Sequence, residues 1–344
     1  MIVRLLSNAF LTDVSKYGLG VLIFTAMLAA AAAFVYFRGP GVSKKSTLPV
    51  SVNYHFTRQC NKSCGFCFHT ATTSFKLDDE KAKEGLARLR AAGMKKLNFA
   101  GGEPFLYPKF LGMLAKFCKE DLRLESVSIV TNGSLVERKF LEKYGKYIDI
   151  LAVSCDSFNE QTNINIGRGK GDQVTKLFKI ADWCHEFGIK FKLNTVVCNL
   201  NYQEDMNATI QRLQPFRWKC FQVLMVAGEN DSEKTLRDVR KFQITDDQYA
   251  DFCLRHKHQP SFVAEPNNLM AKSYLILDEY MRFLDRDGRS PSESILEVEV
   301  ATALKQVFWD EESFVKRGGV YDWSRDQGKA ENGCSPSESK NLEW

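Results

Sequence analysis

Beyond residue 46, short runs of alternating apolar and polar residues are separated by longer amphipathic stretches. In residues 50–56 the apolar side chains fall at every second position, which is the period of a half-buried β-strand. Residues 78–92 instead follow the period of a helix, which Gly93 ends. Six strands are predicted in this way, over residues 50–56, 97–100, 126–131, 148–154, 189–196 and 218–226. Because helical stretches separate them, we expect parallel βαβ units.

The two ends of the chain differ from this alternating region. Residues 19–37 are uncharged and apolar on every side, close to the length that crosses a bilayer. The basic residues around them weakly place the following part in the cytosol, and a cleaved signal peptide is the alternative. Beyond residue 227 the pattern turns mostly helical and irregular. We therefore divide the chain into residues 1–45 as a membrane anchor and linker, 46–226 as the α/β region, and 227–344 as a C-terminal extension that closes the active site and ends in a flexible tail.

Length and composition narrow the class of protein. The chain has 344 residues, of which 44% are hydrophobic, enough for one large α/β domain. The net charge of +5 is mild, and the sequence contains no long basic run. Direct binding of nucleic acid is therefore not expected. Most of the ten cysteines are scattered, several of them in apolar stretches. This pattern favours buried, reduced thiols over a disulfide scaffold.

Three cysteines carry the strongest chemical signal. Cys60, Cys64 and Cys67 have the spacing C-x3-C-x2-C, and no fourth cysteine is near. A [4Fe–4S] cluster takes a ligand on each iron, so three cysteines leave one iron open to another ligand. The segment resembles the cluster loop of radical S-adenosylmethionine (SAM) enzymes, including the aromatic Phe66 before the last cysteine. The alternative is a zinc site with His69 as fourth ligand, although a ligand two residues after Cys67 crowds such a site.

Further blocks resemble one family of these enzymes. The stretches NYHFTRQCNKSCGFCFHT, NFAGGEPFL, SCDSF, IGRG, RWKCFQ and SYLILDEYMRFL are similar to those of the viperin family of interferon-inducible antiviral radical SAM enzymes, in the same order, over about residues 50–323. The resemblance implies an α/β fold, a partial (β/α)6 radical SAM barrel with its site at the carboxyl ends of the strands. It also implies an N-terminal membrane-associating helix, although residues 19–37 lack the polar face of such helices.

The resemblance implies a SAM site built from several of these blocks. Its cofactor-binding residues would be Gly101, Gly102, Glu103, Asn132, Ser154 and Arg168. The two glycines let backbone approach a ligand, and the carboxylate of Glu103 can take the ammonium of SAM. Asn132 and Ser154 end predicted strands and would contact the SAM ribose or carboxylate, with turn or capping residues as the alternative. Arg168 would pair with the SAM carboxylate or with substrate, and a solvent-facing arginine is its alternative.

Cations on two late strands indicate a phosphate site. Period two places Lys192 and Asn194 on one face of their strand, and Arg217 and Lys219 on one face of the next. Clustered cations bind polyphosphate, whereas isolated charges on a strand are usually solvated. In the family these positions bind a nucleoside triphosphate, and the implied substrate-binding residues are Asn53, Lys96, Lys192, Asn194, Arg217, Lys219 and Tyr274. Tyr274 is also a candidate catalytic residue, as a late proton or electron donor.

The activity that the resemblance implies is the dehydration of CTP to 3′-deoxy-3′,4′-didehydro-CTP, a nucleotide that ends viral RNA chains. A [4Fe–4S] cluster and SAM would supply a 5′-deoxyadenosyl radical that removes hydrogen from C4′. Loss of the 3′-hydroxyl and a one-electron reduction would then give the alkene. Two other functions stay open at this point. One is dehydration of another nucleoside triphosphate such as UTP, and the other is a membrane-bound antiviral interaction protein with a structural cluster.

The resemblance also implies partners and a location. The enzyme would need an electron-donating reductase, and Trp344 would be a handle for the cytosolic iron–sulfur assembly machinery. Its place would be the cytosolic face of the endoplasmic reticulum membrane and of lipid droplets.

Overall fold

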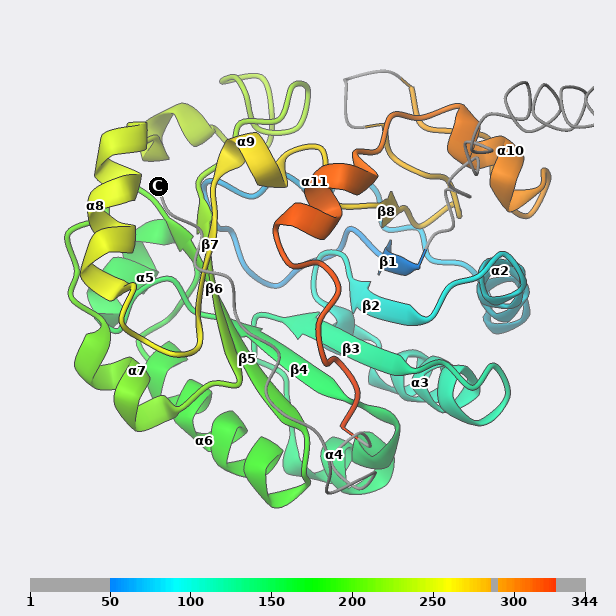
Figure 1. Cartoon of the computed structure of the whole chain (residues 1–344), viewed down its shortest axis with the longest axis horizontal. Helices are drawn as coiled ribbons and strands as arrows, with labels where there is room; N and C mark the ends of the chain where they lie inside the picture. The colour runs from blue at the N-terminus through cyan, green and yellow to red at the C-terminus, as the bar shows by residue number, and fades with distance from the viewer. Residues whose placement is uncertain (1–49, 286–289, 326–344) are drawn as a thin grey trace, which may run out of the picture. The chain divides into compact units, whose positions relative to one another are not determined.

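The computed structural model describes residues 50–285 and 290–325, so the predictions for residues 1–45 and for Trp344 fall outside it. Eight parallel strands form one sheet in the order β7-β6-β5-β4-β3-β2-β1-β8. The sheet is curved, and helices lie along its outer side (Figure 1). The strands are β1 Ser51–His55, β2 Lys96–Ala100, β3 Ser126–Thr131, β4 Ile150–Ser154, β5 Lys190–Val197, β6 Arg217–Gln222, β7 Phe262–Glu265 and β8 Ile276–Leu277. This is the α/β half-barrel that the resemblance implied.

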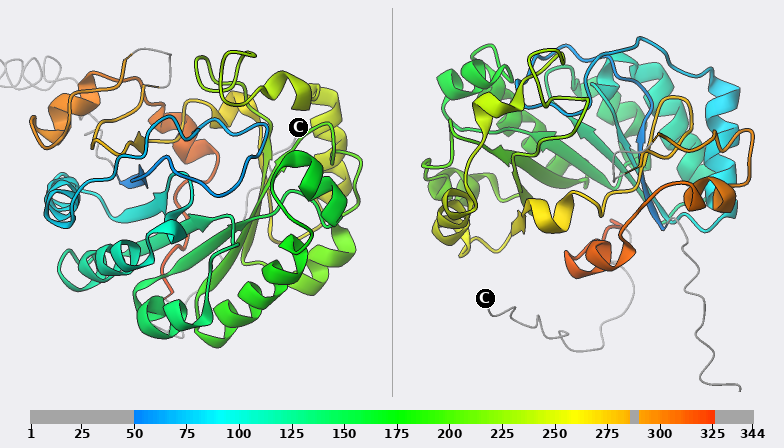
Figure 2. Two further views of the ribbon diagram at one scale, coloured as in Figure 1. Left: turned by 180° about the vertical axis from the view of Figure 1, so that it is seen from behind. Right: turned by 90° about the horizontal axis from the view of Figure 1, so that it is seen from above.

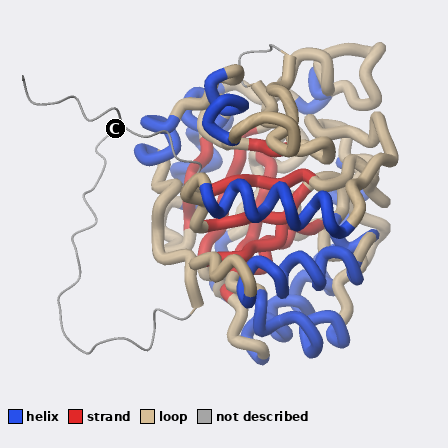
Figure 3. Tube along the Cα trace, turned by 90° about the vertical axis from the view of Figure 1, so that its right-hand side faces the viewer, coloured by secondary structure: helices blue, strands red, loops and turns tan. Residues whose placement is uncertain are grey.

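Helices connect successive strands and cover the outer side of the sheet (Figures 2 and 3). The helices are α2 Asp79–Ala91, α3 Pro108–Glu120, α4 Arg138–Tyr144, α5 Glu160–Ile166, α6 Gln173–Glu186, α7 Asn207–Leu213, α8 Asp246–His256, α9 Asn267–Met270, α10 Val300–Lys305 and α11 Glu311–Lys316, with short 3₁₀ helices η1 Pro104–Leu106, η2 Gly145–Tyr147 and η3 Val239–Phe242. In the part of the chain that is described, no helix is both long enough and apolar enough to cross a bilayer.

The period-two pattern of the strands separates an apolar outer face from a polar inner face. In β1, Val52 and Tyr54 are fully buried and belong to the same core cluster as Leu86 of α2. Asn53 and His55, which alternate with them, instead line a cavity on the inner side. The strand pattern therefore builds the helix-covered core and the site at the same time.

The predicted helix over residues 78–92 is α2, and its ends follow the expected chemistry. The side chain of Asp78 caps its first turn by accepting a hydrogen bond from the backbone N–H of Lys81 at 2.8 Å. After its last turn, Gly93 takes a φ of +108°, which suits a residue without Cβ. Gly85 faces Met281, whose sulfur would lie 2.6 Å from an added Cβ, so α2 and the C-terminal region pack closely.

All six predicted strands are present, and the C-terminal region adds two more. β7 continues the sheet beyond β6, and β8 pairs with β1 at the opposite edge. Both were missed because they have only four and two residues, too few for a clear alternating pattern. The region after residue 226 therefore takes part in the sheet as well as covering it.

The segment after α11 runs along the sheet to α4, at the ends where the strands begin (Figure 1). The hydroxyl of Ser126, the first residue of β3, donates to the carbonyl of Trp323 at 3.0 Å. The guanidinium of Arg325 donates to the carbonyl of Gly145 at 2.9 Å. This segment, residues 317–325, also supplies Arg317 and Tyr321 to the cavity lining.

Candidate active site

A cavity of about 350 Å³ extends along the inner face of the sheet. It reaches from the cysteine loop after β1 to side chains at the first residues of the strands, such as Lys96. Most of the predicted site residues line it: Asn53, Cys60, Cys64, Cys67, Lys96, Gly101, Gly102, Asn132, Ser154, Arg168, Lys192, Asn194, Lys219 and Tyr274. Two predicted residues, Glu103 and Arg217, are outside the lining.

The cysteine loop is held in shape by backbone hydrogen bonds. The N–H of Cys67 donates to the carbonyl of Cys64 at 3.1 Å, which closes a turn. The N–H of Gly65 donates to the carbonyl of Ile166 at 2.9 Å and ties the loop to the end of α5. Cys60, Cys64 and Cys67 are all free thiols that face the same cavity.

These three thiols fit the ligation of an iron–sulfur cluster. Within residues 50–285 and 290–325, no three His, Cys, Asp or Glu side chains are placed to hold a single metal ion. A [4Fe–4S] cluster makes a different demand, because each thiolate binds a different iron and the sulfurs therefore stand apart. Burial raises the pKa of Cys64 to about 12 and raises those of Cys60 and Cys67 as well, so cluster binding must displace their protons.

The two glycines of the GGEP sequence hold backbone against the start of the cysteine loop. The N–H of Gly102 donates to the carbonyl of Thr57 at 2.7 Å. A Cβ at Gly102 would lie 1.9 Å from the carbonyl oxygen of Gln59, and one at Gly101 would lie 2.3 Å from that of Thr57. Gly101 also has a φ of +134°. Only glycine fits these two positions, which bring the backbone to the cavity wall.

Glu103 lies just behind the cavity lining, in the turn after β2. Its carboxylate is fully buried and accepts hydrogen bonds from the hydroxyl of Thr131 at 2.6 Å and from the N–H groups of Asn132 at 2.7 Å and Phe105 at 3.0 Å. These contacts fix the end of β3, and the contact of Glu103 with the SAM ammonium stays a prediction. Burial raises the pKa of Glu103, while these hydrogen bonds act in the opposite direction.

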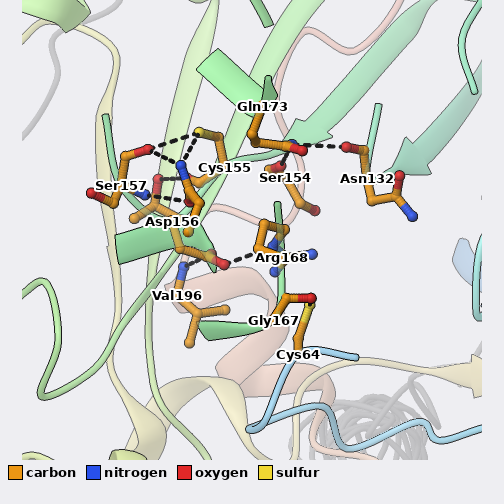
Figure 4. Close-up of polar contacts among 12 residues, drawn as sticks. Cys64, Asn132, Ser154, Cys155, Asp156, Ser157, Gly167, Arg168, Gln173 and Val196 are labelled. Atoms are coloured by element: carbon orange, nitrogen blue, oxygen red, sulfur yellow. Dashed lines mark hydrogen bonds and ion pairs between the residues drawn. The ribbon is translucent and has the colours of Figure 1, made fainter. Parts of the chain in front are cut away.

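Asn132 and Ser154 are joined by a residue that the sequence did not indicate. The side-chain amide of Gln173, the first residue of α6, donates to the carbonyl of Asn132 at 2.8 Å and to that of Ser154 at 2.9 Å (Figure 4). The side-chain amide of Asn132 in turn donates to Asn61 in the cysteine loop at 2.8 Å. The ends of β3 and β4 are thus held together next to Cys60.

The side chain of Arg168 lies beside the cysteine loop and is only 12% exposed. Its Nε donates to Oδ2 of Asp156 at 2.7 Å, and both side chains are drawn in Figure 4. Its guanidinium carbon lies 5.8 Å from the centre of the Phe66 ring. The solvent-facing alternative is therefore wrong, whereas the pairing of Arg168 with the SAM carboxylate or with substrate stays a prediction.

Three lysines form the cationic end of the cavity. Lys96 donates to the hydroxyl of Tyr321 at 3.1 Å, and burial lowers its pKa to about 7. Burial lowers the pKa of Lys219 to about 8, and burial together with the charge of Lys219 holds the pKa of Lys192 well below its usual value. Without an anion, these three cations repel one another, which is the condition that a bound polyphosphate relieves.

A carboxylate and a second arginine complete this cationic end. Glu265 is fully buried at the end of β7, forms an ion pair with Lys219, and lies 3.5 Å from Nη1 of Arg317. Burial favours its neutral acid, but the two cations outweigh burial and lower the pKa of Glu265. Arg217 departs from the prediction, because it donates to the carbonyl of Gly318 at 3.3 Å and packs on Tyr321 instead of lining the cavity.

Tyr274 and Asn53 lie in the cavity as predicted, each held by neighbours. The hydroxyl of Tyr274 accepts a hydrogen bond from Lys219 at 2.9 Å, and Arg317 lies 3.8 Å from its ring centre. Burial raises the pKa of Tyr274, which keeps its proton at neutral pH. The amide of Asn53 donates to the carbonyl of Leu275 at 3.0 Å and accepts from Asn98 at 3.0 Å.

Comparison with known proteins identifies the family. Residues 54–213 match the Radical SAM superfamily. The chain is 53% identical over 290 residues, 83% of each protein, to "S-adenosylmethionine-dependent nucleotide dehydratase RSAD2" of Oncorhynchus mykiss. The corresponding protein of Danio rerio is 54% identical over 291 residues, covering 83% of this chain and 81% of that protein. The chain belongs to the viperin family of SAM-dependent nucleotide dehydratases. A more distant relative, the SAM-dependent nucleotide dehydratase of Flammeovirga pacifica, is 32% identical over 82% of this chain and 98% of its own length.

Solved structures support the same fold for this viperin-family chain. SuiB of Streptococcus suis bound to S-adenosylmethionine aligns with a TM-score of 0.59 at 16% identity, over 79% of this chain and 68% of SuiB. anSMEcpe with bound AdoMet aligns with a TM-score of 0.58 at 14% identity, over 74% of this chain and 77% of that one. At these identities the likeness concerns the fold of the barrel alone.

Some residues in and around the cavity were not predicted from the sequence. Asp156 lies in the quoted SCDSF block, two residues after Ser154, and its acidic side chain at a strand end was the available signal. Gln173 begins a helix, and Glu265 and Arg317 come from segments far along the chain. No local pattern places such residues in one cavity, because only the closure of the fold brings them together.

Proposed function

We propose that the protein is a radical SAM enzyme that dehydrates CTP to 3′-deoxy-3′,4′-didehydro-CTP. One observation carries the proposal, namely that three free thiols and a group of lysines line the same cavity. Cys60, Cys64 and Cys67 would hold a [4Fe–4S] cluster, which together with SAM supplies a 5′-deoxyadenosyl radical. A site of this kind needs a reductively activated cofactor at one end and a polyphosphate at the other, so that the ribose lies between them.

The chain's own residues hold the two ligands and exclude water. The backbone at Gly101 and Gly102, with Ser154 and Arg168, lies where the amino acid part of SAM would bind next to the cluster. Lys96, Lys192 and Lys219 bind the triphosphate, a role supported by the burial of Lys96 and Lys219 and by the lowered pKa values of all three. Asn53 and Asn194 offer amides to the ribose and base. Tyr274, protonated and hydrogen-bonded to Lys219, can donate a proton at the substrate.

The nucleobase is tested directly. Reconstituted enzyme is incubated without oxygen with SAM, dithionite and one of CTP, UTP, GTP or ATP, and the products are measured by mass spectrometry. We expect CTP alone to give a product lighter by one water, with 5′-deoxyadenosine formed in step. A Cys64→Ala variant serves as the control without a complete ligand set. Turnover of UTP in preference to CTP would show that UTP is the substrate. SAM cleavage without any nucleotide product would contradict the dehydratase assignment.

We also propose where the enzyme works and which partners serve it. Residues 19–37 would attach it to the cytosolic face of the endoplasmic reticulum and lipid droplets, a proposal supported by their uncharged, apolar sequence. Trp344 would be read by the cytosolic iron–sulfur assembly machinery, because a large aromatic ring suits capture in a pocket. A reductase would deliver electrons to the cluster, and an antiviral role would follow from the chain-terminating product.

A further inference from the structure

Asp156 is a buried carboxylate next to the cluster end of the cavity, but it does not itself line the cavity. It follows β4 and is fully buried. Its Oδ2 accepts from Nε of Arg168 at 2.7 Å, and its Oδ1 accepts from the backbone N–H of Val196 at 2.9 Å (Figure 4). The carboxylate is therefore fixed on one side by β5 and on the other by the arginine.

This arrangement determines which part of Arg168 faces the cavity. Nε is the only side-chain nitrogen of Arg168 that donates a hydrogen bond to a group within residues 50–285 and 290–325. The two terminal nitrogens are left for a ligand, and Arg168 lines the cavity together with Cys60 and Cys64. A guanidinium that is held through Nε presents a planar pair of donors, the geometry that binds a carboxylate in two places.

We propose that Asp156 is a positioning residue that aims the guanidinium of Arg168 at the carboxylate of the SAM methionine group. The inference rests on the proposed function, since it assigns the cavity next to the cysteines to SAM. Asp156 acts through Arg168, because within residues 50–285 and 290–325 its carboxylate is hydrogen-bonded to Arg168 and to the N–H of Val196 alone. Without the negative charge, the arginine loses its oriented partner and can turn toward other acceptors.

The test measures SAM binding to reconstituted, unreduced protein, so that no turnover is required. Asp156→Asn keeps the size of the side chain but removes its charge. We expect the Kd for SAM to rise about tenfold, a change that corresponds to about 1.4 kcal/mol. The iron content and the Kd for CTP should remain within about twofold of the wild type. A positioning role changes the Kd for SAM alone, whereas general loosening of the fold would also change the Kd for CTP and the iron content.

Asp149→Asn is the matched control at the other end of β4. Asp149 is also fully buried, forms an ion pair with Lys119 at 3.0 Å, and accepts from the N–H of Val127 at 2.8 Å, but it does not line the cavity. It should lose thermal stability and keep its affinity for SAM. A SAM Kd that rises equally in both variants would overturn the proposal.

A double-mutant cycle tests whether Asp156 acts through Arg168. We expect Arg168→Gln to weaken SAM binding at least as much as Asp156→Asn, and the double variant to be no weaker than Arg168→Gln alone. Full additivity would overturn the proposal. If Asp156→Asn does not fold, Asp156→Glu keeps the charge but displaces the guanidinium, and it should show a smaller rise in the SAM Kd. Wild-type protein that binds no SAM would instead contradict the proposed function.

Discussion

Buried lysines define the chemistry of the substrate end of the cavity. Lys96 and Lys219 have pKa values near 7 and 8 in the free protein, because burial penalises their charged forms. A bound triphosphate favours the charged forms and raises both values. We therefore expect nucleotide binding to take up protons between about pH 7 and 9, and affinity to fall as the pH rises through this range. Calorimetry in two buffers of different ionisation enthalpy measures the uptake, and Lys96→Met should reduce it. Binding heats that do not depend on the buffer would contradict this account.

Lys192 allows function to be separated from stability. Its folded-state pKa lies well below that of the unfolded chain, so the unfolded state binds more protons. The lysine therefore lowers stability most at low pH, and this cost disappears as the pH rises above the usual lysine pKa. Lys192→Met is expected to raise the melting temperature at pH 7, by roughly 2–4 °C for each kcal/mol recovered. It should also raise KM for CTP about tenfold or more, since a charge-assisted contact of about 1.5–3 kcal/mol is lost.

The matched variant is Lys190→Met on the same strand. Lys190 forms an ion pair with Asp322 at 2.9 Å and does not line the cavity. This variant should leave KM unchanged and should not gain stability. A Lys192→Met protein that is both less stable and normal in KM would show that the lysine is structural.

At this scale most of the predicted site residues line the cavity, and for those on the late strands the reason is that strand alternation assigns side chains to faces. This rule placed Lys192 and Asn194 correctly. The same rule placed Arg217 beside Lys219, but Arg217 donates to the carbonyl of Gly318 and lies outside the lining.

The hydrogen-bond partners of Glu103 at the end of β3 were not predicted, because no spacing rule reveals them. Glu265 was missed because its partner Lys219 is 46 positions away in the chain.

At the scale of elements, the turn after β2 packs so closely against the cysteine loop that its glycines have no room for a side chain. The N–H of Glu103 donates to the carbonyl of Gln59 at 2.7 Å, so the turn and the cysteine loop are bonded directly. Gly102→Ala would place a Cβ 1.9 Å from that carbonyl oxygen and 2.6 Å from the carbonyl oxygen of Arg58. Because both obstacles are backbone atoms, the loop must shift. We expect reconstituted Gly102→Ala to lose most of its iron and its SAM binding.

Gly145→Ala is the comparison for this variant. The nearest atom to a Cβ at Gly145 lies 3.4 Å away, and its φ of −55° suits any residue. It should retain cluster content, measured as iron per protein, and SAM affinity. Normal iron in Gly102→Ala would mean that the loop adapts and that the turn does not position it.

The elements themselves were predictable where the apolar pattern was long enough. Strands of five or more residues between helices were all found, since both periods repeat within them. β8, with two residues, depends on pairing with β1 and has no signal of its own. The path of residues 317–325 was likewise not foreseen, because it is set by contacts with strand ends distant in the chain.

For the whole molecule, the cavity explains how one barrel can hold two ligands. The cysteines lie after β1, whereas Lys96 begins β2 and Lys192 lies near the start of β5. The cysteine end and the lysine end of the cavity are therefore at opposite ends of the strands, as the proposed cofactor and triphosphate sites require. The resemblance placed the site at the carboxyl ends alone, and the cationic residues extend it along the full length of the sheet.

Every residue assigned to this site belongs to one part of the chain. The chain divides into units of residues 1–47 and 48–344, and all cavity-lining residues are in the second. A protein that begins at residue 46 is therefore expected to keep the kcat and KM of the full chain within about twofold. In a vesicle-pelleting assay the full chain should sediment with the lipid, whereas the shortened protein should stay in the supernatant, because residues 19–37 carry the only long uncharged apolar run of the sequence. A shortened protein that still pellets would place the membrane contact on the catalytic unit, and one with a lower melting temperature and reduced kcat would show that residues 1–45 support the barrel.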